Sequence, residues 1–109
     1  MAIVQIGPTA LKMRLDDTSR PAPVLLDVRE PWEVDICRFP GALSIPMNSI
    51  PDRRAELAPD AETVVICHHG GRSQQVALFL ERNGFANLLN LAGGVHAWAS
   101  EVDPDMPTY

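Results

Sequence analysis

Short apolar runs recur along the chain and are separated by longer, more polar segments. Five of these runs have the length of a β-strand: residues 3–6, 24–28, 42–45, 64–67 and 88–91. Several are apolar at successive positions, as strands covered on both faces require. The pattern therefore predicts five short strands, most of them buried inside a sheet.

The segments between these runs carry helical signals. Residues 72–83 are the clearest case, because Val76, Phe79 and Leu80 form an apolar stripe and Gly84 follows as a C′ residue. Three other helices are predicted: one that begins at Pro8, one that Asn48 or Ser49 caps, and one that follows Gly93-Gly94. Helices thus lie between most of the predicted strands.

Strands that are separated by a dozen or more residues, including a helix, need crossover connections and favour parallel pairing. The predicted fold class is therefore α/β: three layers, with a mainly parallel sheet flanked by helices. A length of 109 residues fits a single domain, residues 1–109. The tail, residues 103–109, is too rich in proline for a helix and is expected to lie extended on the surface.

Composition narrows the possible partners. The net charge is −5 and the chain has no run of Lys or Arg, so nucleic acid and anionic membranes are poor partners. No apolar stretch reaches the length of a membrane span, and the first residues lack the features of a secretory signal. Two cysteines, Cys37 and Cys67, make no disulfide framework. We expect a protein of the reducing cytoplasm; the sequence is silent on oligomeric state.

Candidate chemistry concentrates in residues 63–73, where an apolar run ends in Cys67. A loop with two glycines follows, and then Arg72 and Ser73 open a predicted helix. Ligands of open α/β sheets bind at such strand ends, and both backbone N–H groups and a helix N-terminus favour negative charge. We therefore expect Cys67 to be a thiolate and a nucleophile.

A plainer interpretation is that Cys67 is a buried apolar residue that ends a strand, which is a common role for a single cysteine. That interpretation accounts for the strand before Cys67 but not for the loop after it. The loop is polar, and the pair Gly70-Gly71 permits positive φ and a close approach of the backbone to an anion. The functional interpretation is therefore preferred.

Four motifs, in order along the chain, resemble those of rhodanese-like sulfurtransferases. The loop Cys-His-His-Gly-Gly-Arg-Ser, residues 67–73, is similar to the active-site loop of that family. Residues 25–33 (LLDVREPWE), 39–46 (FPGALSIP) and 90–98 (NLAGGVHAW) resemble three further family motifs. Together the motifs span nearly the whole chain, and their combination is far more specific than any one of them.

The resemblance implies a reaction and a set of site residues. In the family, the loop cysteine takes the outer sulfur of a donor such as thiosulfate and passes it to cyanide, a thiol or a protein acceptor. Here Cys67 is the implied nucleophile, and no cofactor is needed. The loop residues expected to bind the substrate are His68, His69, Gly70, Gly71, Arg72 and Ser73. Asp27 and Arg29 lie at another strand end and are expected to pair and brace the loop.

Several alternatives remain open at this stage. Four residues separate Cys67 from Arg72, one fewer than in the related phosphatases, so a phosphatase ranks below a sulfurtransferase. A non-catalytic module that binds a partner or senses redox state is the other alternative. Arg72 can either pair with a substrate sulfonate or brace the loop.

Two further features concern cysteine and metal chemistry. Cys37 and Arg38 replace a Gly-His pair of the family, and Cys37 either fills space or resolves a persulfide; the role of Arg38 is open. No metal site is expected, because the adjacent residues Cys67, His68 and His69 cannot easily share one ion. His96 stands alone on its predicted helix.

Overall fold

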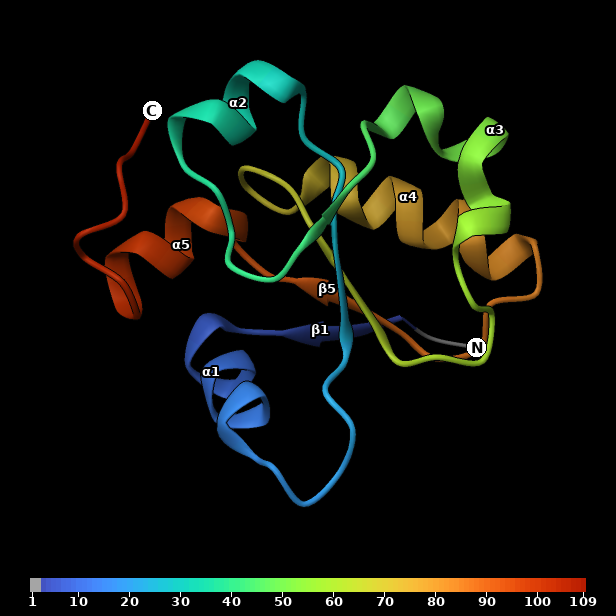
Figure 1. Ribbon diagram of the computed structural model, residues 1–109, viewed down its shortest axis with the longest axis horizontal. Helices are drawn as coiled ribbons and strands as arrows, with labels where there is room; N and C mark the ends of the chain where they lie inside the picture. The colour runs from blue at the N-terminus through green and yellow to red at the C-terminus, as the bar shows by residue number, and fades with distance from the viewer. Residues whose placement is uncertain (1–2) are drawn as a thin grey trace.

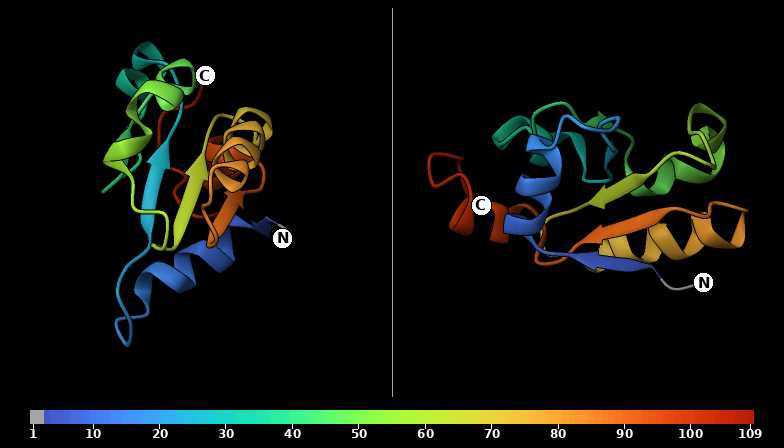
Figure 2. Two further views of the ribbon diagram at one scale, coloured as in Figure 1. Left: turned by 90° about the vertical axis from the view of Figure 1, so that its right-hand side faces the viewer. Right: turned by 90° about the horizontal axis from the view of Figure 1, so that it is seen from below.

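Five strands form a single parallel sheet in the order β1-β5-β4-β2-β3. The computed structural model describes residues 3–109, so residues 1 and 2 of the predicted domain lie outside the described part. The strands are β1 (Val4–Ile6), β2 (Val24–Asp27), β3 (Leu43–Ser44), β4 (Thr63–Ile66) and β5 (Leu88–Leu91). All five predicted strands are confirmed, and Figure 2 shows β4, β5 and β1 side by side.

Helices cover both faces of this sheet. They are α1 (Pro8–Asp16), α2 (Pro31–Ile36), α3 (Ile50–Arg53), α4 (Gly71–Arg82) and α5 (Gly94–Glu101). Figure 1 shows α1 and α5 toward the left of the view, and α3 and α4 toward the right. The predicted three-layer α/β architecture is therefore confirmed.

The alternation of side chains along β4 divides the core between the two faces. Val65 packs in one buried cluster with Val76 and Leu80 of α4. Its neighbour Val64 packs in the other cluster with Trp98 of α5. Because successive strand residues point to opposite faces, a strand that is buried along its whole length, such as β4, contributes to both clusters.

One predicted helix is broken, and one helix, α2, is additional to those that the sequence predicts. The helix expected after Asn48 or Ser49 is broken into a 3₁₀ turn, the single turn α3, and a second 3₁₀ turn that ends at Glu56. No side chain caps α3. Helix α2 begins with a capping box, in which the Glu30 side chain and the Glu33 side chain each accept the other residue's backbone N–H.

The tail after α5 is not helical, but it is packed more tightly than the extended surface course expected from its prolines. Met106 is 7% exposed and joins the apolar cluster of α1 and α5. A turn from the Asp103 carbonyl to the Met106 N–H reverses the chain there. Burial of an apolar side chain thus holds the tail against the domain.

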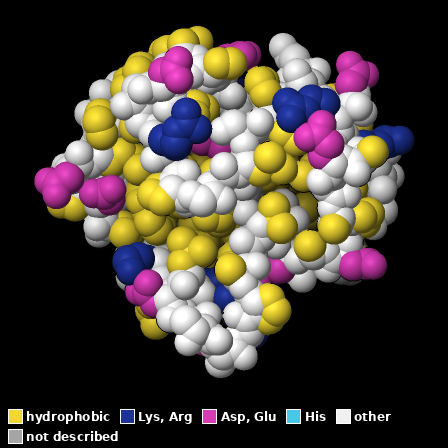
Figure 3. Space-filling view, in the orientation of Figure 1, with side chains coloured by type: hydrophobic (Ala, Val, Ile, Leu, Met, Phe, Trp, Pro, Cys, Tyr) yellow, Lys and Arg dark blue, Asp and Glu magenta, His cyan; other side chains and the backbone are white. Residues whose placement is uncertain are grey.

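Parallel register aligns the carboxyl ends of β2 and β4. Asp27 is the register partner of Ile66, so the residues after each strand emerge at the same edge of the sheet. On the face shown in Figure 3, acidic and basic side chains are scattered and form no single-sign patch. Within residues 3–109, no helix is both long and apolar enough to cross a membrane.

Candidate active site

Cys67 follows β4 directly and is the deepest residue of the cysteine loop, residues 67–70. Its side chain is almost fully buried, at 1% exposure. The Gly70 N–H donates a hydrogen bond to Cys67 Sγ at 3.0 Å. The sequence predicts several backbone N–H groups around this sulfur. Among the described residues, the Gly70 N–H is the one that hydrogen-bonds to it.

The geometry of Gly70 explains why a glycine is needed there. Gly70 is the N-cap of α4 and has a φ of 105°, in the left-handed region that favours glycine. A Cβ at Gly70 would also lie 3.3 Å from the Gly93 nitrogen. Gly71, in contrast, has no positive φ and has space around it. The predicted need for glycine therefore applies to the first of the pair.

Ser73 lies beneath the loop. It is fully buried, and its Oγ is 3.3 Å from Cys67 Sγ. The same hydroxyl hydrogen-bonds to Asn90 Oδ1 on β5. Since a hydroxyl has one proton, Ser73 donates either to Asn90, while accepting from a thiol, or to a thiolate. Ser73 thus contacts the Cys67 sulfur from inside the protein, which differs from the substrate-binding position that the sequence suggests.

Helix α5 holds the cysteine loop from the other side. The Val95 N–H donates to the Cys67 carbonyl at 2.9 Å, and the His96 N–H donates to the His68 carbonyl at 3.1 Å. These bonds are possible because Gly94 allows the two backbones to approach. A Cβ at Gly94 would lie 2.3 Å from the His68 oxygen and 2.4 Å from the Cys67 oxygen.

Replacement of Gly94 by alanine is expected to cost about 2–5 kcal/mol of unfolding free energy, from left-handed strain plus the backbone clash. Gly84→Ala is the matched control, because Gly84 also has a positive φ but nothing within 4 Å of the added Cβ. Urea unfolding of both variants measures the difference. An equal decrease in unfolding free energy in the two variants would show that the close approach of the backbones at Gly94 does not contribute to stability.

Arg72 braces the loop through its side chain. Its two terminal nitrogens donate to the two carboxylate oxygens of Glu33, each at 2.7 Å. Glu33 lies on α2 and is 3% exposed. This contact is the one that the bracing role of Arg72 requires. Glu33 is 39 positions from Arg72, and no local sequence pattern points to this partner.

Asp27 and Arg29 form the predicted pair, and both are buried. The Arg29 Nη2–H donates to Asp27 Oδ2 at 2.7 Å, and the Nε–H donates to Oδ1 at 2.9 Å. The remaining donors of Arg29 do not reach the cysteine loop. They bind the Cys37 carbonyl at 2.8 Å and the Tyr109 hydroxyl at 3.1 Å. The pair therefore fixes α2 and the tail, and it supports the loop only indirectly.

Tyr109 joins these two ion pairs into one network. It accepts from Arg29, and its hydroxyl donates to Glu33 Oε1 at 3.0 Å. Burial raises the pKa of Tyr109 to about 12. Burial opposes the charge of Arg29, but hydrogen bonds to Asp27 and Tyr109 outweigh it and raise the pKa of this guanidinium. No local sequence signal points to Tyr109.

Glu33 provides a test of this network. Hydrogen bonds from Arg72 lower the pKa of Glu33 from 4.5 to about 2. Because the folded value is the lower one, the stabilisation is complete above about pH 4.5 and is lost as the pH falls toward 2. The shift corresponds to a stabilisation on the order of 3 kcal/mol.

Replacement of Glu33 by glutamine is therefore expected to lower the free energy of unfolding at pH 7. At about pH 3.5 the difference in unfolding free energy between this variant and the wild type is expected to be smaller by about 1 kcal/mol. Urea unfolding at the two pH values measures this change. Glu101→Gln, at an exposed position of α5, is the control. A difference for Glu33→Gln that stays constant with pH would contradict the ion pair.

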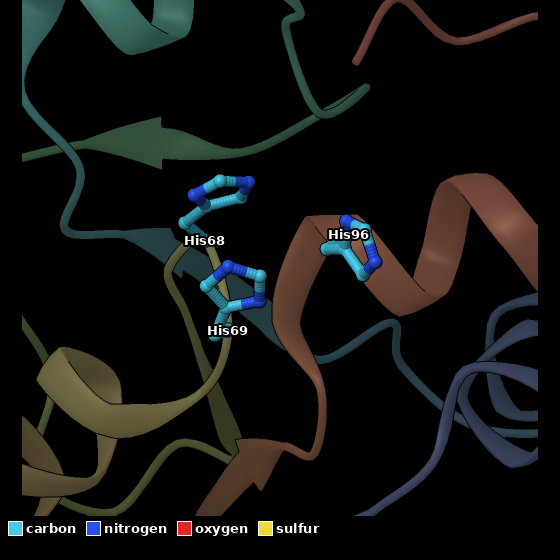
Figure 4. A group of neighbouring side chains, drawn as sticks. All are labelled: His68, His69 and His96. Carbon is cyan, nitrogen blue, oxygen red and sulfur yellow. The ribbon is translucent and has the colours of Figure 1, made fainter. Parts of the chain in front are cut away.

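Three histidines meet beside the loop, contrary to the expectation that His96 stands alone. The His69 and His96 ring centroids are 5.0 Å apart, and those of His68 and His96 are 6.0 Å apart. Figure 4 shows His68 and His69 on the loop and His96 on the first turn of α5. Docking of α5 on the cysteine loop brings them together. Burial, followed by the charge of His69, lowers the pKa of His68.

The two tryptophans pack against other aromatic rings, one in the core and one at the rim. Trp98 is buried against Phe39, with ring centroids 4.7 Å apart. Trp32 is 61% exposed and lies edge-on to Tyr109 at the rim.

Cys37 is a free, buried thiol in the apolar cluster on the face opposite Cys67, which fits the space-filling interpretation.

Comparison with known proteins agrees with this geometry. The family model described as "Rhodanese-like domain" matches residues 8–101. A protein of *Allochromatium vinosum* named "Sulfurtransferase" is 39% identical over 95 residues, with 87% of each chain covered. The chain covers only 30% of an *Arabidopsis thaliana* relative, "Rhodanese-like/PpiC domain-containing protein 12, chloroplastic", which is 43% identical over 89 residues.

A solved structure shows the same fold. The crystal structure of a rhodanese-like domain protein from *Staphylococcus aureus* superimposes with a TM-score of 0.83 at 32% identity. The match covers 98% of this chain and 99% of that one. From the motifs, the fold and these matches, the chain belongs to the rhodanese-like domain family.

Proposed function

We propose that the protein is a sulfurtransferase that carries a sulfane sulfur as a persulfide on Cys67. The observation that carries this proposal is the position of Cys67. Its sulfur lies at the carboxyl end of a buried parallel strand, accepts the Gly70 N–H, and is followed by the N-terminus of α4. The N–H group and the helix N-terminus both stabilise negative charge on sulfur. The similarity to a protein named "Sulfurtransferase" supports the same conclusion.

The proposed reaction has two steps. The Cys67 thiolate attacks the outer sulfur of a donor such as thiosulfate, the sulfur–sulfur bond of the donor breaks, and its electron pair leaves with sulfite. In the second step, a thiolate, cyanide or protein acceptor attacks the outer sulfur of the persulfide, and Cys67 leaves as the thiolate. Both steps need an anionic sulfur on Cys67, and neither needs a general base or a cofactor.

The amide and the helix N-terminus act on both forms of the site. The Gly70 N–H is already oriented toward Cys67 Sγ, so it need not reorganise when charge returns to the sulfur. Ser73 supplies a second donor by turning its proton from Asn90 to the sulfur. We therefore propose that Ser73 donates a hydrogen bond to the Cys67 sulfur when that sulfur is anionic, and that the sulfur-donating substrate contacts the outer part of the loop.

Access to the sulfur requires movement of the loop. Cys67 is 1% exposed, whereas His69 is exposed and His68 is half-buried. We propose that the segment His68–Gly70 shifts to admit the donor, with Arg72 and α5 holding its two ends. Direct pairing of Arg72 with a substrate sulfonate is not part of the proposal, because Glu33 occupies both ends of its guanidinium.

The same contact argues against a phosphatase. A phosphate needs an arginine that turns into the loop, and Arg72 is bound to a buried carboxylate instead.

Incubation with thiosulfate and cyanide tests the proposal, with thiocyanate and sulfite as the expected products. An intact fold without either product would favour a non-catalytic binding module. Hydrolysis of an aryl phosphate would favour the phosphatase.

A further inference from the structure

All three histidines of the chain lie in one cluster, formed by His68, His69 and His96. Each offers a ring nitrogen, and these nitrogens all lie within 4.8 Å of one another. The hydrogen bonds of His68 and His96 within residues 3–109 run through backbone atoms, which leaves the ring nitrogens available. Three imidazoles gathered from two separate elements make a ligand set that neither element provides alone (Figure 4).

We propose that His68, His69 and His96 bind one divalent transition-metal ion of the Zn²⁺ class through their ring nitrogens. Imidazole is a ligand that zinc, copper and nickel all accept, and Zn²⁺ commonly takes three protein ligands and leaves a fourth position open. The cluster supplies three ring-nitrogen ligands. The site includes His68 and His69 of the segment that is proposed to admit the sulfur donor, but metal binding itself does not require the proposed function.

Binding of an ion needs small displacements and one change of ring orientation. His69 stacks on His68, with ring centroids 4.1 Å apart and planes inclined by 28°, and must turn out of this stack to direct a nitrogen at the ion. Bonds of about 2.0–2.1 Å in a tetrahedral site place the ligand nitrogens roughly 3.4 Å apart, so the present spacing shortens by about 1.4 Å at most. His69 and His96 are exposed and can turn. His68 is held by stacking on Tyr109, with ring centroids 4.0 Å apart and planes inclined by 15°. His68 is therefore the fixed ligand, and the other two adjust to it.

Cys67 is not part of the proposed ligand set, although it precedes His68. Its sulfur is buried, accepts the Gly70 N–H at 3.0 Å and contacts Ser73. Coordination by this sulfur would require the loop to give up both contacts. Metal binding through histidine is therefore expected to survive the loss of Cys67.

Calorimetric titration of the untagged full chain with ZnCl₂ tests the site. We expect one ion per chain, and we expect His69→Gln and His96→Gln each to lower the affinity at least about tenfold. The controls Cys67→Ala and Glu101→Gln are expected to bind as the wild type does. Thermal unfolding gives a second measurement, in which Zn²⁺ raises the Tm of the wild type more than that of either histidine variant.

Three results would overturn the proposal. The first is the absence of binding up to millimolar Zn²⁺, and the second is an unchanged affinity in both folded histidine variants. The third is loss of binding in Cys67→Ala, which would place the ion on the thiolate. Circular dichroism of each variant establishes that it is folded, so a loss of affinity is assigned to the ligand that was removed.

Discussion

Replacement of Cys67 by serine is expected to reduce sulfur transfer from thiosulfate to cyanide by at least about a thousandfold, to the uncatalysed background. A serine hydroxyl stays protonated near neutral pH and is a weak nucleophile without a base beside it. Among the described residues, Ser73 is the side chain that hydrogen-bonds to position 67, and a serine hydroxyl is not a base. Thiocyanate formation at saturating thiosulfate measures the effect.

Cys37→Ser is the matched control, since Cys37 is also a free and buried cysteine. It lies in the other apolar cluster and contacts Arg29, with the Arg29 Nη1 nitrogen 3.4 Å from its sulfur. We expect this variant to keep most of the activity. Comparable losses in the two variants would indicate that both thiols take part, as in the redox-sensing alternative, and would contradict a single-cysteine mechanism.

The largest effect on stability is expected at Asp27. Arg29 is fully buried and Asp27 is 1% exposed, so Asp27→Ala leaves a buried guanidinium without its carboxylate. Removal of one partner of a buried ion pair typically costs about 3–5 kcal/mol. Urea unfolding near neutral pH measures this loss. Asp27→Asn keeps an oxygen that can accept one hydrogen bond and is expected to lose less.

An exposed ion pair of the same length is the control. Lys12 and Asp16 also approach to 2.7 Å, but their side chains are 50% and 62% exposed. Asp16→Ala is expected to cost less than about 1 kcal/mol, because water replaces the lost partner. If Asp27→Ala were no more costly than Asp16→Ala, the buried pair would not fix α2 and the tail as described.

Features carried by neighbouring residues could be predicted from the sequence. Strand β4 is visible because its four residues are all β-branched, and the end of α4 is visible because Gly84 follows it. The pair of Asp27 and Arg29 is also local, since alternate residues at a strand end point the same way. These features need no knowledge of the tertiary fold.

Features that join distant segments could not be predicted in this way. Glu33 and Arg72 are 39 positions apart, and Tyr109 is 76 positions from Glu33. His96 meets His69 only because α5 docks on the cysteine loop through Gly94. Local patterns report which face of an element is apolar, and they carry no information on which polar side chains will meet across the sheet edge.

The break in the segment that contains α3 has a different cause. Pro51 lies in the first turn of α3 and has no N–H to donate, so it suits a helix start. The turn then ends at Arg53, and a 3₁₀ turn replaces a continuous helix up to Leu57. Ile50 and Leu57, at the two ends of this segment, are both buried in the apolar cluster on that face, so no longer helix is needed to pack them.

The most direct test of the account is the mass of the protein after it meets a sulfur donor with no acceptor present. Intact-mass spectrometry of the thiosulfate-treated protein is predicted to show one added sulfur atom, located by peptide mapping on Cys67 and removed by cyanide. The Cys67→Ser variant is predicted to gain nothing. An unmodified wild-type protein, or a sulfur found on Cys37 instead, would contradict the central claim.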